Sequence, residues 1–291
     1  MIGIISAFAA SISWTYACFL WRAQTNYIKP IDINFLKNLL AFLVFSPFLL
    51  SFNEVLEYRY FIILILSGII GIGLGDTFYL KSLKLIGTRK TLTIEALSPL
   101  IAAFSGQLFI NEYLSINAWI GIFVVSTSLI IIIKKENNLF DSNGTLVPIH
   151  LKFGNYIYSF LSVFCAVIAA LLSRLVFLET NLSPIQTTEI RLLGSIIFLI
   201  IFTKIKLNIF IINLDKKEKM KFIFSVLLGT NIGIFLQQVV FQTLQLGIGW
   251  TLLSTSPVIS LFIARKEEGK LDNINIFFTI FLFIGLGLVI L

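Results

Sequence analysis

Two carboxylic acids, Asp76 and Glu95, lie within apolar stretches of this sequence. They flank a short basic turn in the run from Gly68 to Glu112, which we interpret as a transmembrane helical hairpin. An unpartnered charge in such a helix costs about 2.5 to 3.5 kcal/mol on insertion scales, so both side chains need a partner or a water-filled path. They could carry a proton or face a substrate. Alternatively, they could form a fixed ion pair with Lys37 that holds the hairpin to the neighbouring helix.

Basic side chains also lie inside apolar runs. Lys37 follows Pro30 by seven residues, and Arg191 follows Pro184 by seven. Because both lie near helix starts, their charged heads could reach the membrane interface by snorkelling, or they could contact an anionic group of a substrate. At a helix rise of about 1.5 Å per residue, we expect one polar cluster near each end of the bundle. One contains Lys37 and the two carboxylates, and the other contains Arg174, Glu189, Arg191, Gln237 and Gln238.

Aromatic and amide side chains complete a candidate substrate cavity. A buried glutamine is informative because an unsatisfied amide is costly in lipid, whereas single aromatic residues often face lipid. Trp250 could line the cavity or belong to an interfacial belt. The predicted substrate-binding residues are Trp14, Tyr16, Lys37, Asp76, Tyr79, Glu95, Arg174, Arg191, Gln238 and Gln242.

Two prolines within apolar runs, Pro99 and Pro257, predict breaks in their helices. A proline cannot donate to the carbonyl four residues earlier, which would leave the carbonyls of Glu95 and Leu253 unpaired. Bends at these two positions would let each hairpin move as a gate. The alternative is a fixed kink that only shapes the bundle.

The sequence lacks the motifs of a membrane enzyme. No nucleophile and base pair, no HExxH motif and no acidic metal cluster lies in or beside the apolar runs, so we predict no enzyme, no metal and no cofactor. The single histidine, His150, lies in a polar loop and is interpreted as a surface residue. Cys18 and Cys165 lie within apolar runs, which favours a packing role over a disulfide or a metal site.

The composition is that of a membrane protein. Of the 291 residues, 57% are hydrophobic and 13% are charged, with a mean hydropathy of +0.96; soluble domains usually have about 25% charged residues. The first run has neither a basic leader nor a small-residue cleavage site, so we expect a retained span and not a signal peptide. The predicted spans of a bilayer core of ~30 Å are 2–21, 33–51, 60–80, 91–110, 116–133, 153–178, 185–203, 221–244, 248–264 and 274–291.

The distribution of Lys and Arg predicts the orientation. Loops after odd-numbered spans carry nearly all the basic residues, whereas loops after even-numbered spans hold only Arg59. By the positive-inside rule, the odd loops are cytoplasmic and both termini lie outside the cell inner (plasma) membrane. The net charge of +7 is explained by this topology, so we predict no nucleic-acid partner.

An internal repeat divides the chain into two. The spacing from a proline to a basic residue occurs once in each half, and Leu-Ser-Pro at 97–99 corresponds to Thr-Ser-Pro at 255–257. Five spans per copy, an odd number, invert one copy relative to the other, as in many secondary transporters. We therefore predict an all-α integral membrane protein with ten transmembrane helices as two inverted five-helix repeats. The repeats are residues 1–134 and 153–291, joined by the loop 135–152.

The runs GLGDTFYLKSLKLIG and LSPLIAAFSGQLFINE, with a looser copy ending in SPVISLFIARKEE, resemble the drug/metabolite transporter superfamily, specifically its EamA-type two-repeat transporters. The resemblance covers nearly the whole chain. The family's pattern of a proline followed thirteen residues later by a glutamate is met by Pro99 and Glu112; in the second copy Glu268 follows Pro257 by only eleven. The resemblance implies a carrier with a central cavity between inverted halves, which works by alternating access on amino acids, related metabolites or drugs.

We expect a monomeric secondary carrier that exports small metabolites such as amino acids, with the lipid bilayer and a small-molecule substrate as partners and protons as the candidate coupling ion. Within transport, the alternative is an exchanger of organic phosphates or nucleotide sugars, which would need several basic residues on one cavity. From another class, the alternative is a lipid-modifying membrane enzyme.

Overall fold

The computed structural model of the protein describes residues 1–51, 57–136, 153–202, 215–263 and 273–290. Helices form nearly all of this part of the chain, and no strand occurs in it. A helix satisfies its backbone hydrogen bonds within one segment, which suits a chain surrounded by lipid. The predicted all-α fold is confirmed.

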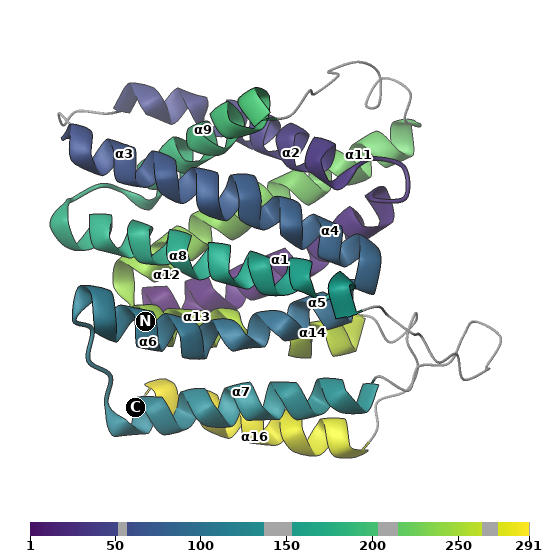
Figure 1. Cartoon of the computed structure of the whole chain (residues 1–291), viewed down its shortest axis with the longest axis vertical. Coiled ribbons are helices and arrows are strands. Elements are labelled where there is room, and N and C mark those ends of the chain that lie inside the picture. The colour runs from purple at the N-terminus through teal and green to yellow at the C-terminus, as the bar shows by residue number, and fades with distance from the viewer. Residues whose placement is uncertain (52–56, 137–152, 203–214, 264–272, 291) are drawn as a thin grey trace.

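Within the described residues the helices cross the bundle ten times, as the sequence predicts (Figure 1). The passes of the first half are α1 (Ile2–Gln24), α2 and η1 (Pro30–Phe45, Ser46–Ser51), α3, η2 and α4 (Tyr58–Ser67, Gly68–Gly75, Asp76–Ile86), α5, η3 and α6 (Thr88–Ile94, Glu95–Leu97, Ser98–Ile110) and α7 (Ile116–Glu136). Those of the second half are η4 and α8 (Phe153–Asn155, Ile157–Glu179), α9 (Pro184–Phe202), α11, η5 and α12 (Lys216–Ser225, Val226–Gly233, Ile234–Thr243), α13 and α14 (Leu246–Leu253, Ser256–Ile263) and α16 (Asn273–Ile290).

Seven of these passes are, within the described part of the chain, long and apolar enough to cross a membrane. The helices α7 and α16 contribute shorter apolar stretches, Ile116–Ile131 and Ile280–Ile290. The pass formed by α13 and α14 is interrupted by a turn at Ser254 and Thr255. The protein is therefore a multi-pass membrane protein.

Both chain termini lie at one end of the bundle, together with the turns α6–α7 and α8–α9 (Figure 1). We call this the termini end, and the other the opposite end. Helix α1 starts at the termini end, whereas α8, the first pass of the second half, starts at the opposite end. Corresponding passes of the two halves thus run in opposite directions, which is the inverted arrangement predicted from five passes per half.

The two halves interleave around the centre of the bundle. Helix α1 packs against η5, α12, α13 and α14 of the second half, and η2 packs against α8 and α9. Glycine permits such close contacts: a Cβ atom on Gly194 of α9 would lie 2.5 Å from the carbonyl oxygen of Ile65 in α3. Small residues at helix interfaces are the usual means by which membrane helices approach each other. Helices α7 and α16 pair with each other along one side (Figure 1).

Two π-helical segments, η2 and η5, occupy corresponding places in the third and eighth passes. Each is eight residues long, and each continues directly into a helix, α4 or α12. A π turn changes the regular pairing of backbone groups, so some carbonyls need partners from other helices. Such segments are frequent at functional sites.

Gly121 tests the contact between α7 and α16. A Cβ atom there would lie 2.6 Å from the carbonyl oxygen of Gly285 and 2.6 Å from Cγ2 of Val289. We expect Gly121→Ala to push the helices apart and to lower the free energy of unfolding by about 1–3 kcal/mol, measured as a lower midpoint of thermal unfolding in detergent micelles. Gly287→Ala is the control, because no described atom lies within 4 Å of its Cβ position. Equal midpoints for the two variants would contradict this packing.

Candidate functional site

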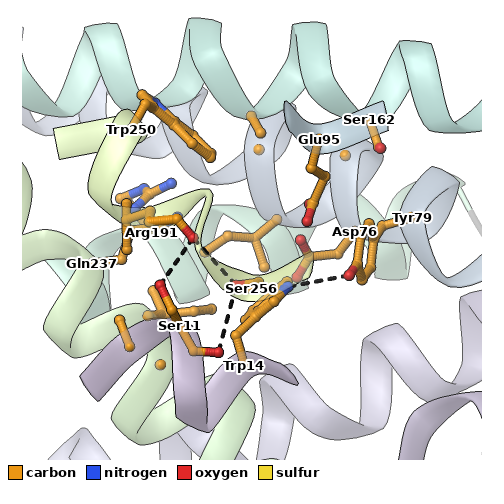
Figure 2. A pocket seen from close by; sticks show the side chains of 18 residues that line it. Ser11, Trp14, Asp76, Tyr79, Glu95, Ser162, Arg191, Gln237, Trp250 and Ser256 are labelled. Carbon is orange, nitrogen blue, oxygen red and sulfur yellow. Dashed lines mark hydrogen bonds between the residues drawn. The ribbon is translucent and has the colours of Figure 1, made fainter. Parts of the chain in front are cut away.

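A cavity of about 740 Å³, its open mouth included, lies between the two halves (Figure 2). Its walls come from α1, η2, α4 and η3 of the first half and from α8, α9, η5, α12, α13 and α14 of the second. The polar and aromatic lining residues are Ser11, Trp14, Asp76, Tyr79, Glu95, Ser162, Arg191, Gln237, Trp250 and Ser256.

Corresponding positions of the two halves line the cavity, but the residues at these positions differ in charge. The residue spacing that relates Pro99 to Pro257 also relates Asp76 to Ile234 and Glu95 to Leu253. The two residues of each of these last two pairs line the cavity. Both carboxylates therefore come from the first half. The charged lining residue of the second half is Arg191.

Asp76 is neutralised by a buried lysine. Lys37 Nζ of α2 lies 2.5 Å from Asp76 Oδ2 and donates a second hydrogen bond to Asn38 Oδ1 at 2.9 Å. The lysine side chain is 1% exposed and that of Asp76 is 15% exposed. Of the two residues, only Asp76 lines the cavity. The ammonium also lies 5.4 Å from the centroid of the Trp21 ring, a cation–π contact. Lys37 thus lies behind the cavity wall, where it compensates the charge of Asp76.

An asparagine joins this ion pair to the π-helical segment η2. Asn34 Nδ2 donates to the carbonyl oxygens of Ile72 at 2.8 Å and Gly73 at 3.0 Å, while Asn34 Oδ1 accepts from Asn38 at 3.0 Å. Thr77 Oγ1 also donates to the Gly73 carbonyl, at 2.6 Å. These bonds supply partners to carbonyls in the irregular segment, which could find none in lipid. The cavity wall is thereby fixed to α2.

Glu95 lies on the short 3₁₀ turn η3 and points toward Asp76 in the cavity (Figure 2). Among the described residues its carboxylate has no hydrogen-bond or ion-pair partner. Its backbone carbonyl accepts from the N–H of Ser98, so the expectation that Pro99 leaves this carbonyl unpaired is wrong. The 3₁₀ turn replaces the lost bond with one from the residue three positions later.

The second half satisfies the corresponding carbonyl differently. The Leu253 carbonyl accepts from Ser11 Oγ of α1 at 2.9 Å and from Ser256 Oγ at 3.2 Å. It too is paired, contrary to the sequence-based expectation. Pro99 and Pro257 are each the second residue of a helix, α6 and α14, that begins after a break. The predicted breaks are present at both positions.

Arg191 brings an uncompensated positive charge to the cavity. The residue is 3% exposed, and its Nε and Nη1 atoms have no hydrogen-bond partner among the described residues. Gly71 leaves room for the guanidinium, because a Cβ atom there would lie 3.3 Å from Nη2. The expectation of separate polar clusters near the two ends is therefore wrong for Arg191. Its Cα lies about 10 Å into α9, and its long side chain reaches the cavity that the two carboxylates also line.

An aromatic wall lies beside these charges. Trp14 Nε1 donates to the Tyr79 hydroxyl at 3.2 Å, and their ring centroids are 5.6 Å apart. The Tyr79 hydroxyl also lies 3.0 Å from the sulfur of Cys18. The Nε1 donor of Trp250 is buried without a partner in the described part of the chain. The cavity thus offers apolar ring surface as well as unused hydrogen-bond donors.

Several predicted substrate-binding residues do not line the cavity. Tyr16 is 48% exposed, and Gln238 is fully buried but absent from the lining. Gln242 Nε2 donates to the Leu182 carbonyl at 3.2 Å. Arg174 pairs with Glu112 at the termini end. His150 and Glu268 lie outside the described residues.

Sequence reasoning placed Gln237 in the polar cluster with Arg191 but not among the substrate-binding residues, and it missed the lining serines Ser11, Ser162 and Ser256. Serine in a membrane helix looks like an ordinary packing residue, so no sequence signal marked these positions. Gln237 stands at the position that corresponds to Tyr79 of the first half. In the described part of the chain, no three His, Cys, Asp or Glu side chains are grouped so that they could hold a metal ion.

The Lys37–Asp76 pair can be tested by a double-mutant cycle. We expect Lys37→Met to lower the free energy of unfolding by about 3–5 kcal/mol, because it leaves a buried carboxylate without its counter-ion. Adding Asp76→Asn should recover most of that loss. The measurement is the midpoint of thermal unfolding in detergent micelles. A double variant no more stable than Lys37→Met alone would show that the two charges are not coupled.

Comparison with known proteins gives two findings. The sequence matches the model of the EamA-like transporter family over residues 1–134 and 154–291. One protein of known crystal structure superposes with a TM-score of 0.72 over 98% of this chain and 95% of its own, at 12% sequence identity, which shows a shared fold. No curated protein matches the sequence.

Proposed function

Since the chain belongs to the EamA-like transporter family, we propose that it is a secondary active transporter that exports small zwitterionic metabolites, foremost amino acids, by alternating access. The observation that carries the proposal is a cavity between inverted halves, lined by the guanidinium of Arg191 and the carboxyl group of Glu95, neither of which has an ion-pair partner among the described residues. Substrate sites of secondary transporters with inverted repeats lie at such an interface.

The charges of the cavity match those of a free amino acid. Lys37 neutralises Asp76, so the uncompensated charges of the lining are the cation of Arg191 and the carboxyl group of Glu95. An arginine fork binds a carboxylate through two parallel hydrogen bonds. In this proposal Arg191 binds the carboxylate of the substrate and Glu95 binds its ammonium group. Trp14, Tyr79 and Trp250 would contact the side chain of the substrate.

The alternative substrates fit the cavity less well. An organic phosphate or nucleotide sugar carries two or more negative charges and calls for several cations on one cavity. Arg191 is the one cationic residue among the described lining residues. Lys37 is paired with Asp76, and Arg174 is paired with Glu112 outside the cavity.

A membrane enzyme is also disfavoured by the lining. The hydroxyl groups of Ser11 and Ser256 donate to backbone carbonyls, and neither has a hydrogen-bonded base of the kind that activates a nucleophile.

Alternating access requires moving parts, and we assign them to the hairpins α4–α5 and α12–α13. Each hairpin lies between a π-helical segment and a break beside a proline, Pro99 or Pro257. Local irregularities of this kind absorb changes in backbone angles. In the proposed orientation the termini end faces outward from the inner membrane, and the α4–α5 turn, with Lys81 and Lys84 close to it, is cytoplasmic.

The role of Arg191 predicts a change in ligand preference. Arg191→Gln should weaken binding of amino acids at least about tenfold, because a charge-assisted hydrogen bond contributes about 1.5–3 kcal/mol. Binding of the corresponding amines that lack the carboxylate should change little. The measurement is isothermal titration calorimetry on purified protein, with Arg59→Gln, outside the cavity lining, as the control. Unchanged amino-acid affinity would remove this role from Arg191.

The two carboxylates predict how transport depends on pH. If protons are the coupling ion, they bind at Asp76 or Glu95, because these are the carboxyl groups that line the cavity. We expect the Asp76→Asn, Glu95→Gln double variant to transport more slowly, because it also lacks the contact of Glu95 with the ammonium group, and we expect the transport that is left to be independent of pH in proteoliposomes. A double variant that transports with the full pH dependence of the native protein would place proton coupling elsewhere.

A further inference from the structure

We propose that Glu112 and Arg174 are positioning residues: they hold the α12–α13 hairpin against the rest of the bundle and keep the cavity closed toward the termini end. The proposal rests on the proposed function, since closure of one end matters for a protein that opens its cavity alternately to two sides. Neither residue lines the cavity.

The contacts of the pair converge on the turn of the hairpin. Arg174 Nε of α8 donates to Glu112 Oε1 at 2.6 Å, and Arg174 Nη1 donates to the carbonyl oxygens of Phe241 at 2.9 Å and Gln242 at 2.8 Å. Glu112 Oε2 accepts from the backbone N–H of Leu246 at 2.6 Å. Three hydrogen bonds thus join α8 and the α6–α7 connection to the last residues of α12 and the first residue of α13. The fourth joins α8 to the α6–α7 connection.

These bonds match the chemistry of the two helix ends. The last carbonyls of a helix and its first N–H groups have no partners within the helix, and the helix dipole favours a cation at the C-terminus and an anion at the N-terminus. Arg174 caps the end of α12 and Glu112 caps the start of α13. Their side chains are 11% and 8% exposed, so salt and water screen the pair little.

The backbone around Glu112 is shaped to aim this carboxylate at the hairpin. Asn111 ends α6 in the left-handed conformation, with φ of 55°, which asparagine tolerates better than most residues. The N–H of Glu112 then donates to the Gly106 carbonyl at 3.1 Å. Beside it, α13 contacts α6 closely: a Cβ atom on Gly247 would lie 2.8 Å from Cβ of Ala103.

Movement of the hairpin would change the cavity directly, because the hairpin carries part of the lining. Gln237 of α12 and Trp250 and Leu253 of α13 all line the cavity. By holding this hairpin in place, the pair stabilises the state closed at the termini end.

The test measures the position of the hairpin by electron paramagnetic resonance. Spin labels are placed at Ile116→Cys of α7 and Thr243→Cys of α12, both exposed, with Cys18 and Cys165 replaced by serine, in lipid nanodiscs. We expect Glu112→Gln to raise the population at longer label distances at least about tenfold, which corresponds to about 1.4 kcal/mol. The glutamine keeps an oxygen that can accept from the Leu246 N–H but removes the charge.

Matched variants separate positioning from general damage. Arg174→Gln should also raise the longer-distance population, and Arg174→Lys should partly reverse it, because lysine keeps the charge without the planar fork. Glu218→Gln is the control, since it breaks the surface ion pair with Lys221 on α11 and should leave the distances unchanged. Native-like distances in both Glu112→Gln and Arg174→Gln would overturn the proposal.

The distance measurement needs no substrate, so the two proposals fail separately. A hairpin released by Glu112→Gln in a protein that transports no amino acid would support the positioning role and overturn the proposed function. Native-like distances in a protein that does transport amino acids would overturn the positioning role alone.

Discussion

A lipid bilayer offers no water to a peptide group, so each carbonyl released by an irregular helix must find its partner inside the protein. This constraint governs the centre of the structure. Asn34 supplies partners to the carbonyls of Ile72 and Gly73 in η2, and Ser11 supplies one to the Leu253 carbonyl. The helices can then be widened and broken where the cavity forms. The hydrogen bonds from Asn34 through Asn38 to Lys37 also hold the counter-ion of Asp76.

Inverted halves give the cavity its position, and departures from their symmetry give it its chemistry. The π-helical segments and the breaks before Pro99 and Pro257 recur in both halves. The charges that line the cavity do not: both carboxylates come from the first half, and the guanidinium of Arg191 comes from the second. Lys37, which corresponds to Arg191 in the first half, lies behind the wall and is paired with Asp76. A symmetric scaffold can exchange two conformations, while an asymmetric lining can bind one orientation of a substrate with unlike charged ends.

The sequence predicts the architecture well because hydropathy and the Lys and Arg bias are properties of whole segments. All ten passes and their inverted order follow from it. The sequence predicts the site less well, because contacts such as those of Asn34 depend on a π-helical segment that no local sequence pattern predicts. The pairing of Arg174 with Glu112 likewise depends on the left-handed turn at Asn111. The depth of Arg191 estimated from the helix rise placed it near one end of the bundle, because such an estimate gives the position of Cα and ignores the length of the side chain.

The central claim is that one charged cavity, built by both halves, carries amino acids across the membrane. Counterflow in proteoliposomes tests it most directly: vesicles loaded with an unlabelled amino-acid mixture are diluted into a trace of each labelled amino acid. The account predicts transient, protein-dependent accumulation of at least one label, and none when the vesicles are loaded with nucleotide sugars. Accumulation driven by nucleotide sugars, with no response to any amino acid, would contradict it.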